Sequence, residues 1–314
     1  MSRLRLGTRA SALALTQSQH VADALVAHGH EVELVRITTH GDRSSAAISQ
    51  LGGTGVFVTA LRDALLAGEV DLAVHSFKDL PTARADGLVI AAVPPRQDPR
   101  DVLVARDGLT LGELPPGARI GTGSPRRTAQ LLALGMGLDV VAVRGNVDTR
   151  LGYVAKGELD GVVLARAGLA RLDRLAEVTE TLDPLQMLPA PAQGALAVEC
   201  RAEGEWADLL AVLDHADSRT AVTAERALLA ALEAGCSAPV GALADLAEGD
   251  EGPELFLRGL VAALDGSDSV RLSATGSTHD PIALGERLAA ELLDRGAAQL
   301  MGSDTRDPVM GETR

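Results

Sequence analysis

The sequence has few aromatic residues and almost no cysteine. Phe, Trp and Tyr make up only 2% of its 314 residues, so the core has to be built from Ala, Val and Leu. The two cysteines, Cys200 and Cys236, exclude a disulfide framework, and without a C-x-x-C pair they give no sign of zinc. The seven histidines are scattered, and the two at 28–30 fit a turn after a helix. We therefore expect no metal site.

Long apolar runs are also missing. No stretch approaches the ~20 apolar residues that a membrane span needs. The first fifteen residues, MSRLRLGTRASALAL, alternate Arg with apolar residues and do not form the apolar segment of a signal peptide. We expect a cytoplasmic protein with no membrane partner. The net charge of −14 argues against nucleic acid as a general partner.

The first half of the chain alternates strands and helices. Strands are expected at 3–8, 31–39 and 70–76, with one helix from Ser11, its N-cap, to Gly29 and a second helix at 55–68. The order βαβαβ predicts a parallel sheet covered by helices on both faces. A second α/β unit lies between two proline-rich segments, 93–100 and 188–194. Because a connection lies on each side of this second unit, we expect the chain to leave the first domain at 93–100 and to return to it after 188–194.

A smaller α+β region ends the chain. Helix is expected up to about Gly235, followed by a strand at 255–264 and a final helix with Asp280 as N-cap and Pro281 in its first turn. We therefore expect four parts, which are a first lobe at 1–94 with 194–214, a second lobe at 99–188, a third domain at 216–301 and a disordered tail at 302–314.

The stretch GTGSPRR at 121–127 combines a strand end, a glycine turn and a helix start. Ser124 would be the N-cap and Pro125 the first helical residue, which puts Arg126 and Arg127 in the first turn. The helix dipole is already positive there, so cations are unfavourable unless they serve another purpose. Free backbone N–H groups and two guanidiniums favour an anion site over a solvated charge pair. Without a following Lys-Ser/Thr, the stretch is not a P-loop.

Three further arginines follow predicted strands. Arg9 comes just before Ser11 at the end of the first strand, Arg144 ends an apolar strand, and Arg150 lies in the next helix. Ligands of open α/β sheets bind at the carboxyl ends of the strands. Because guanidinium groups suit carboxylates, the arginines together predict a cleft for a multiply charged anion.

A third cluster follows the apolar strand that ends in His75 and Ser76. Lys78 and Asp79 come next, and Asp79 is a candidate for acid–base work or for stabilising a cation. A plain Lys–Asp turn, closed by Pro81, is the alternative, and these residues alone do not decide between the two.

Cys236 follows the C-terminus of a helix, between Gly235 and the nearby Pro239. The negative end of the helix dipole should raise the pKa of this thiol, which makes it a poor protease-like nucleophile. No sequence signal pairs it with a histidine, so a cysteine hydrolase is disfavoured.

Taken together, the motifs resemble the porphobilinogen deaminase family, also called hydroxymethylbilane synthase. The match runs through nearly the whole chain in order: GTRASALAL, HSFKDLPT, DPRD, GTGSPRR, RGNVDTRL, PAQGALAVECR and LEAGCSAPVGA. The resemblance implies two α/β lobes like those of type II periplasmic binding proteins, and a smaller domain that carries the cysteine. It also implies a monomer in which Cys236 holds a dipyrromethane cofactor through a thioether.

The resemblance further implies a reaction in tetrapyrrole (haem) biosynthesis. Four porphobilinogens are joined head to tail with loss of ammonia, and hydrolysis frees hydroxymethylbilane. Asp79 would stabilise the azafulvenium cation, with Lys78 and Arg9 as further catalytic residues. Arg9, Ser11, Arg144 and Arg150 would bind substrate carboxylates. The cofactor would be held by Ser11, Lys78, Asp79, Thr122, Ser124, Arg126, Arg127, Arg144, Arg150 and Gln193.

The chain departs from the family at two positions. Gly123 stands where the family often has Ser, and Thr54 stands where its glycine loop often has Lys. The alternative function is a non-catalytic protein that binds a small anion, as solute-binding or sensor modules do. Such a protein would have no need for Cys236 or Asp79, and its intact mass would show no attached pyrroles.

Overall fold

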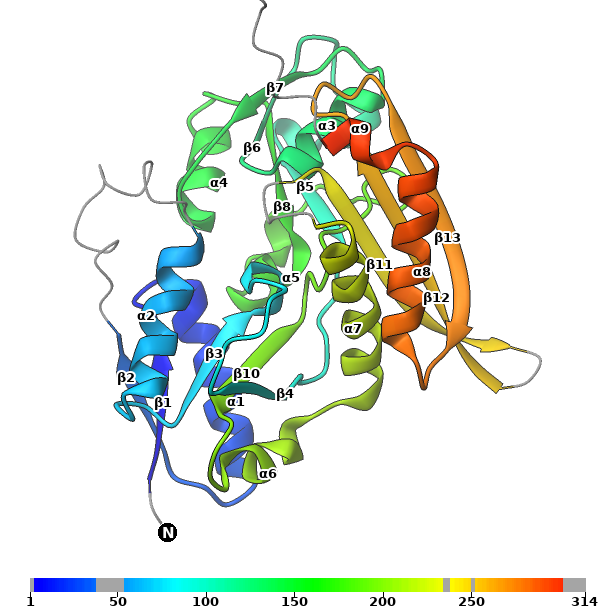
Figure 1. Ribbon diagram of the computed structural model, residues 1–314. Helices are drawn as coiled ribbons and strands as arrows, with labels where there is room; N and C mark the ends of the chain where they lie inside the picture. The colour runs from blue at the N-terminus through cyan, green and yellow to red at the C-terminus, as the bar shows by residue number, and fades with distance from the viewer. Residues whose placement is uncertain (1–2, 38–53, 234–237, 250–251, 302–314) are drawn as a thin grey trace, which may run out of the picture.

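The computed structural model describes residues 3–37, 54–233, 238–249 and 252–301 (Figure 1). Cys236 and the expected disordered tail at 302–314 lie outside the described residues, as does the side chain of Thr54. No helix in the described ranges has the length and apolar character needed to cross a membrane.

The first lobe is built on a five-stranded sheet in the order β2-β1-β3-β10-β4. Its elements are β1 (Leu4–Thr8), α1 (Ala12–Ala27), β2 (Val32–Arg36), α2 (Thr54–Leu66), β3 (Leu72–Ser76), β4 (Leu88–Ala92), β10 (Leu196–Arg201) and α6 (Trp206–Leu210). The expected parallel pairing holds for β1, β2 and β3. Strand β10, whose direction was not predicted, returns from the second lobe and runs antiparallel to both β3 and β4.

The second lobe repeats this plan with the strand order β7-β6-β8-β5-β9. Its elements are β5 (Asp101–Ala105), β6 (Arg119–Thr122), α3 (Pro125–Ala133), β7 (Asp139–Ala142), α4 (Val147–Ala155), β8 (Gly161–Ala165), α5 (Arg166–Arg171) and β9 (Glu180–Thr181). Strand β5 is buried along its whole length and runs antiparallel to β8. In each lobe, therefore, one antiparallel strand is inserted into a set of parallel strands.

The third domain is an antiparallel sheet with helices on one face. It contains α7 (Ala216–Ala231), β11 (Val240–Gly249), β12 (Gly252–Ala262), β13 (Ser269–Ser277), α8 (Pro281–Asp294) and α9 (Ala297–Met301). Helix α8 starts as predicted, because the Asp280 side chain accepts a hydrogen bond from the Ala283 N–H and Pro281 follows it. In Figure 1, α7 lies between the first lobe and this sheet.

Five short 3-10 turns complete the described elements: η2 (Phe77–Asp79), η3 (Arg106–Gly108), η4 (Leu111–Glu113), η5 (Leu175–Glu177) and η6 (Ala211–Leu213). The proline-rich connections, 93–100 and 188–194, pass beside each other, and the Gln97 N–H donates to the Gly194 carbonyl at 3.3 Å. Two α/β lobes, joined twice, and a smaller α+β domain confirm the expected fold class.

Candidate functional site

The polar residues predicted in the first lobe lie where two neighbouring strands end. Strands β1 and β3 pair in parallel, so their carboxyl ends meet at one edge of the sheet. Arg9 follows β1, and Ser11 is the N-cap of α1, where its hydroxyl accepts a hydrogen bond from the Ala14 N–H at 3.4 Å. Lys78 and Asp79 lie in η2, directly after β3. These four residues therefore lie at one edge of the first-lobe sheet.

The second lobe presents the matching edge. Thr122 ends β6, and Ser124 occupies the N-cap position of α3, but its hydroxyl does not cap that helix. Its N–H donates to Thr122 Oγ1 at 3.2 Å. Arg144 follows β7 and is exposed, whereas Arg150 on α4 is half-buried and its Nε donates to the Gly145 carbonyl at 3.0 Å.

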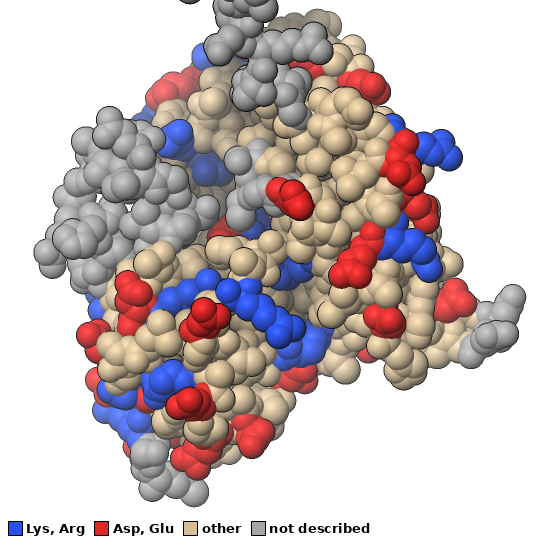
Figure 2. Space-filling view, viewed as in Figure 1, with Lys and Arg blue, Asp and Glu red and all other residues tan. Residues whose placement is uncertain are grey.

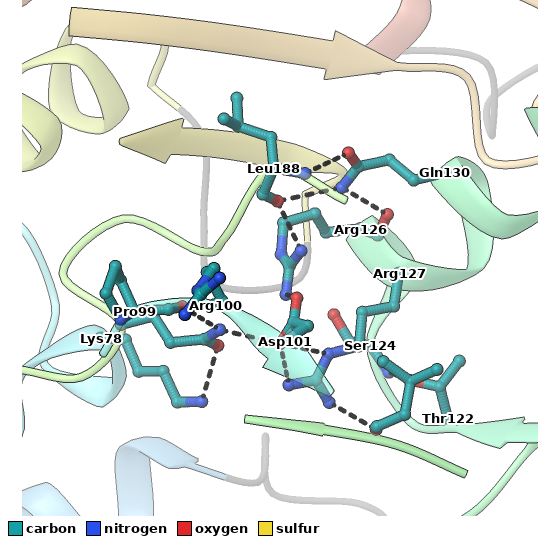
Figure 3. Close-up of polar contacts among 12 residues, drawn as sticks. Lys78, Pro99, Arg100, Asp101, Thr122, Ser124, Arg126, Arg127, Gln130 and Leu188 are labelled. Carbon is teal, nitrogen blue, oxygen red and sulfur yellow. Dashed lines mark hydrogen bonds and ion pairs between the residues drawn. The ribbon is translucent and has the colours of Figure 1, made fainter. Parts of the chain in front are cut away.

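A buried carboxylate lies between Arg126 and Arg127 (Figure 3). Asp101, at the start of β5, accepts from Arg126 Nη2 at 2.8 Å on one oxygen and from Arg127 Nη2 at 2.7 Å on the other. All three side chains are at most 6% exposed, which excludes a solvated charge pair. Asp101 was not among the predicted site residues, although an acidic residue at the start of an otherwise apolar strand was a usable signal.

These contacts leave a surplus of positive charge. Burial by itself would raise the pKa of Asp101, but the two guanidiniums outweigh it and hold that pKa far below its usual range. One carboxylate thus stays ionised against two arginines. Arg126 also donates from Nη1 to the Leu188 carbonyl at 2.6 Å, while its buried Nε has no hydrogen-bond partner among the described residues. A buried cation with an unused donor favours binding of a further anion.

Gln193 connects this cluster to the first lobe. Its amide nitrogen donates to the Pro99 carbonyl at 2.7 Å and to Asp101 at 2.8 Å. Its amide oxygen accepts from Lys78 Nζ at 3.1 Å. Burial lowers the pKa of Lys78 to about 8; the neighbouring Asp79 opposes that shift and Arg127 adds to it. The two predicted clusters therefore meet through one buried glutamine.

Two other features of the structure were not evident in the sequence. Arg171, at the end of α5, donates to the Gly194 carbonyl at 2.6 Å, and burial lowers its pKa to about 10. In the sequence it is indistinguishable from a surface arginine on a helix. A Cβ atom on Gly123 would lie 2.6 Å from the Val143 carbonyl oxygen. The turn at 121–123 therefore approaches the residue after β7 more closely than a serine at 123 would allow.

Figure 2 shows basic side chains in the recess between the lobes, and both acidic and basic side chains on the outer surface of the same face. The sequence as a whole carries a net charge of −14. The recess thus differs in sign from the whole chain. The basic side chains in the recess would attract an anionic ligand.

Two family models match the sequence. The first, described as porphobilinogen deaminase, dipyromethane cofactor binding domain, matches residues 4–208. The second, porphobilinogen deaminase, C-terminal domain, matches residues 219–294. Together they account for all three parts of the fold.

Similar curated proteins extend over nearly the full chain. A porphobilinogen deaminase from Mycobacterium marinum is 62% identical over 311 residues, covering 97% of this chain and 99% of that protein. One from Mycobacterium tuberculosis is 62% identical over 304 residues, with 95% and 98% covered. Among solved structures, the methionine binding protein MetQ matches with a TM-score of 0.43 and 11% identity, covering 67% of this chain and 88% of that one.

Proposed function

This chain belongs to the porphobilinogen deaminase family, and from that premise we propose that it joins four porphobilinogen molecules head to tail on a covalently bound dipyrromethane cofactor. Each condensation releases ammonia, and hydrolysis then frees hydroxymethylbilane for tetrapyrrole (haem) biosynthesis. The observation that carries the proposal is the buried cationic cluster of Arg126 and Arg127, which meets the Lys78–Asp79 turn through Gln193. Family membership disfavours the alternative of a non-catalytic anion-binding protein.

The charges of the cleft fit such a cofactor. Each pyrrole unit carries an acetate and a propionate, so the ligand is a polyanion that grows with each condensation. Arg126 and Arg127 share a single carboxylate, and the buried Arg126 Nε has no partner among the described residues. When bound, the cofactor supplies the pyrrole carbon that attacks the first substrate. We propose that it is held by Ser11, Lys78, Asp79, Thr122, Ser124, Arg126, Arg127, Arg144, Arg150 and Gln193.

Asp79 is proposed to stabilise the reacting substrate. When the substrate ammonium group leaves as ammonia, the C–N electron pair goes with it and positive charge develops on the pyrrole. A carboxylate fixed in a partly buried turn stabilises that charge without reorganising at the moment of reaction. Lys78, whose pKa is about 8, is protonated at neutral pH and can contact a carboxylate or assist proton transfer. Arg9, Ser11, Arg144 and Arg150 would bind the carboxylates of incoming substrate.

We propose that the cofactor is attached at Cys236, as the resemblance to the family implies, and Cys200 is unsuited to that role. Cys200 lies fully buried in β10, and burial raises its pKa to about 11, which leaves the thiol unreactive. We expect wild-type protein to show an intact mass above the polypeptide by two linked pyrrole units. Cys236→Ser should lack that mass and porphobilinogen turnover, whereas Cys200→Ser should keep both. The assignment would be overturned if Cys200→Ser lacked the mass of the two pyrrole units, or if Cys236→Ser still carried it.

We also propose that the protein acts as a cytoplasmic monomer. A single chain supplies every residue of the proposed site, and a reactive thiol is better preserved in a reducing compartment. The units at 1–94 with 194–214, 99–188 and 216–301 are proposed to move relative to one another as the pyrrole chain grows.

A further inference from the structure

We propose that Arg226 is a positioning residue, which holds the Lys78–Asp79 turn in place from the third domain. Arg226 lies on α7, and its guanidinium donates to three backbone carbonyls on both sides of Asp79. Nη1 contacts the carbonyls of Phe77 at 3.3 Å and Leu80 at 3.0 Å, and Nη2 contacts that of Pro81 at 2.6 Å. The same guanidinium lies 4.5 Å from the centre of the Phe77 ring.

The turn needs such support because its own hydrogen bonds are few. A 3-10 turn of three residues has poorer hydrogen-bond geometry than an α-helix and little stability of its own. Within η2, the Leu80 N–H donates to the Phe77 carbonyl at 3.2 Å, and the Phe77 N–H donates to the Ala195 carbonyl at 3.1 Å. The first bond closes the turn and the second fixes its start. Arg226 fixes its far side, where Asp79 leads into Leu80 and Pro81.

Apolar packing brings α7 to the same turn. Phe77 and Leu80 are buried in one hydrophobic cluster with Val222 of α7 and Ala192 of the second connection. Val222 precedes Arg226 by four residues, so the two side chains lie on one face of the helix. Arg226 itself is half-buried. Helix α7 therefore presents an apolar contact and a planar fork of donors to the backbone around Asp79.

This contact links two parts of the reaction, and the inference thus rests on the proposed function. Helix α7 precedes the proposed attachment residue, Cys236, in the sequence. The helix that leads to the point of attachment also fixes the carboxylate that acts on each new pyrrole. A misplacement of about 1 Å can cost on the order of 10²-fold in rate. We therefore expect a loss of Arg226 to lower kcat more than it changes KM.

The test compares Arg226→Ala with Asp79→Asn, in which the carboxylate charge is removed. Arg226→Ala should lower kcat by about 10- to 100-fold, approaching the loss in Asp79→Asn, while KM changes by less than about threefold. The mass of the bound cofactor should be unchanged. Ethylguanidinium added to Arg226→Ala should restore part of kcat. Arg226→Lys should stay impaired, because a single ammonium cannot span the three carbonyls.

Arg219→Ala is the matched control. Arg219 lies on the same helix and also donates to first-lobe carbonyls, those of Ile90 at 3.4 Å and Ala91 at 2.8 Å, while pairing with Asp214. Its removal should lower the Tm by an amount similar to that in Arg226→Ala, yet leave kcat within about twofold of wild type. Equal kcat values for the two variants would show that Arg226 only stabilises the fold.

Hydrogen exchange separates this inference from the proposed function. The backbone amides of 77–80 and 82 should exchange faster in Arg226→Ala than in wild type, and this should not occur in Arg219→Ala. If wild type neither carries pyrroles nor consumes porphobilinogen, the proposed function fails while this readout remains. Unchanged exchange at 77–82 in Arg226→Ala would overturn the positioning role.

Discussion

The ammonium group of Lys78 lies where burial opposes its charge. Its pKa falls from the usual 10.5 to about 8, mainly through loss of solvent; Asp79 opposes the shift, while Arg127 adds to it. The group is therefore charged below about pH 8 and neutral above it. A bound carboxylate would favour the charged form, so binding of the anion and protonation of Lys78 are coupled.

From this coupling we expect kcat/KM for porphobilinogen to fall as the pH rises through about 8. In Lys78→Arg the guanidinium stays charged across this range, so that decline should disappear even if the rate itself is lower. Lys156→Arg is the control, because Lys156 is exposed at the end of α4 and should keep the wild-type profile. A decline that persists unchanged in Lys78→Arg would assign it to another group.

Some of the site could be predicted from single residues and some could not. Lys78, Asp79 and Arg126 stand at strand ends or helix starts, where charge is unusual and local sequence is enough to draw attention. The meaning of Asp101 depends on α3, which begins more than twenty residues later in the chain. Arg171 gave no local signal, because only the fold shows that its guanidinium is removed from water.

At the scale of elements, the presence of a strand was easier to predict than the direction in which it runs in the sheet. The parallel order of β1, β2 and β3 follows from the helices between them. Strands β5 and β10 pair with partners distant in the sequence, and their apolar runs do not encode direction. Because both are antiparallel, both begin at the carboxyl edge of their neighbours. That direction brings Asp101 to the cleft and the segment before β10, with Gln193, beside it.

The crossing of the two connections depends on Gly194. Its φ is +89°, and a Cβ atom would lie 2.3 Å from the Gln97 carbonyl oxygen. Gly117 has a similar φ of +82° with open space around the same position. Gly117→Ala should therefore cost about 1–2 kcal/mol of unfolding free energy, from backbone strain alone.

Gly194→Ala should cost about 1–3 kcal/mol more than Gly117→Ala, because the added methyl group also forces the connections apart. Urea denaturation of both variants measures the difference. Equal losses would mean that the connections can separate freely, and that their contact does not constrain the lobes.

At the scale of the whole molecule, Glu225 connects all three parts. It is fully buried on α7, and its carboxylate pairs with Arg96 of the first connection at 2.7 and 3.0 Å. It also accepts from the N–H of Ala192 in the second connection at 2.6 Å and from that of Ala244 in β11 at 2.8 Å. The third domain thus contacts both connections through one carboxylate, so its attachment is coupled to the position of the two connections.

Glu225→Gln should destabilise the protein by about 3–5 kcal/mol, because it leaves the Arg96 guanidinium buried without its charge partner. Arg96→Met combined with Glu225→Gln should recover part of that loss, since no unpaired charge then remains. Glu33→Gln is the control: Glu33 pairs with Arg3 at 3.5 Å at the exposed surface, and its loss should cost at most about 1 kcal/mol.

Denaturation followed by the fluorescence of Trp206, the only tryptophan, reports on the first lobe, and circular dichroism reports on the whole chain. In Glu225→Gln we expect the two transitions to separate, as the lobes and the third domain lose their shared carboxylate. Coincident transitions with a loss no larger than that of Glu33→Gln would show that the three parts are held together elsewhere.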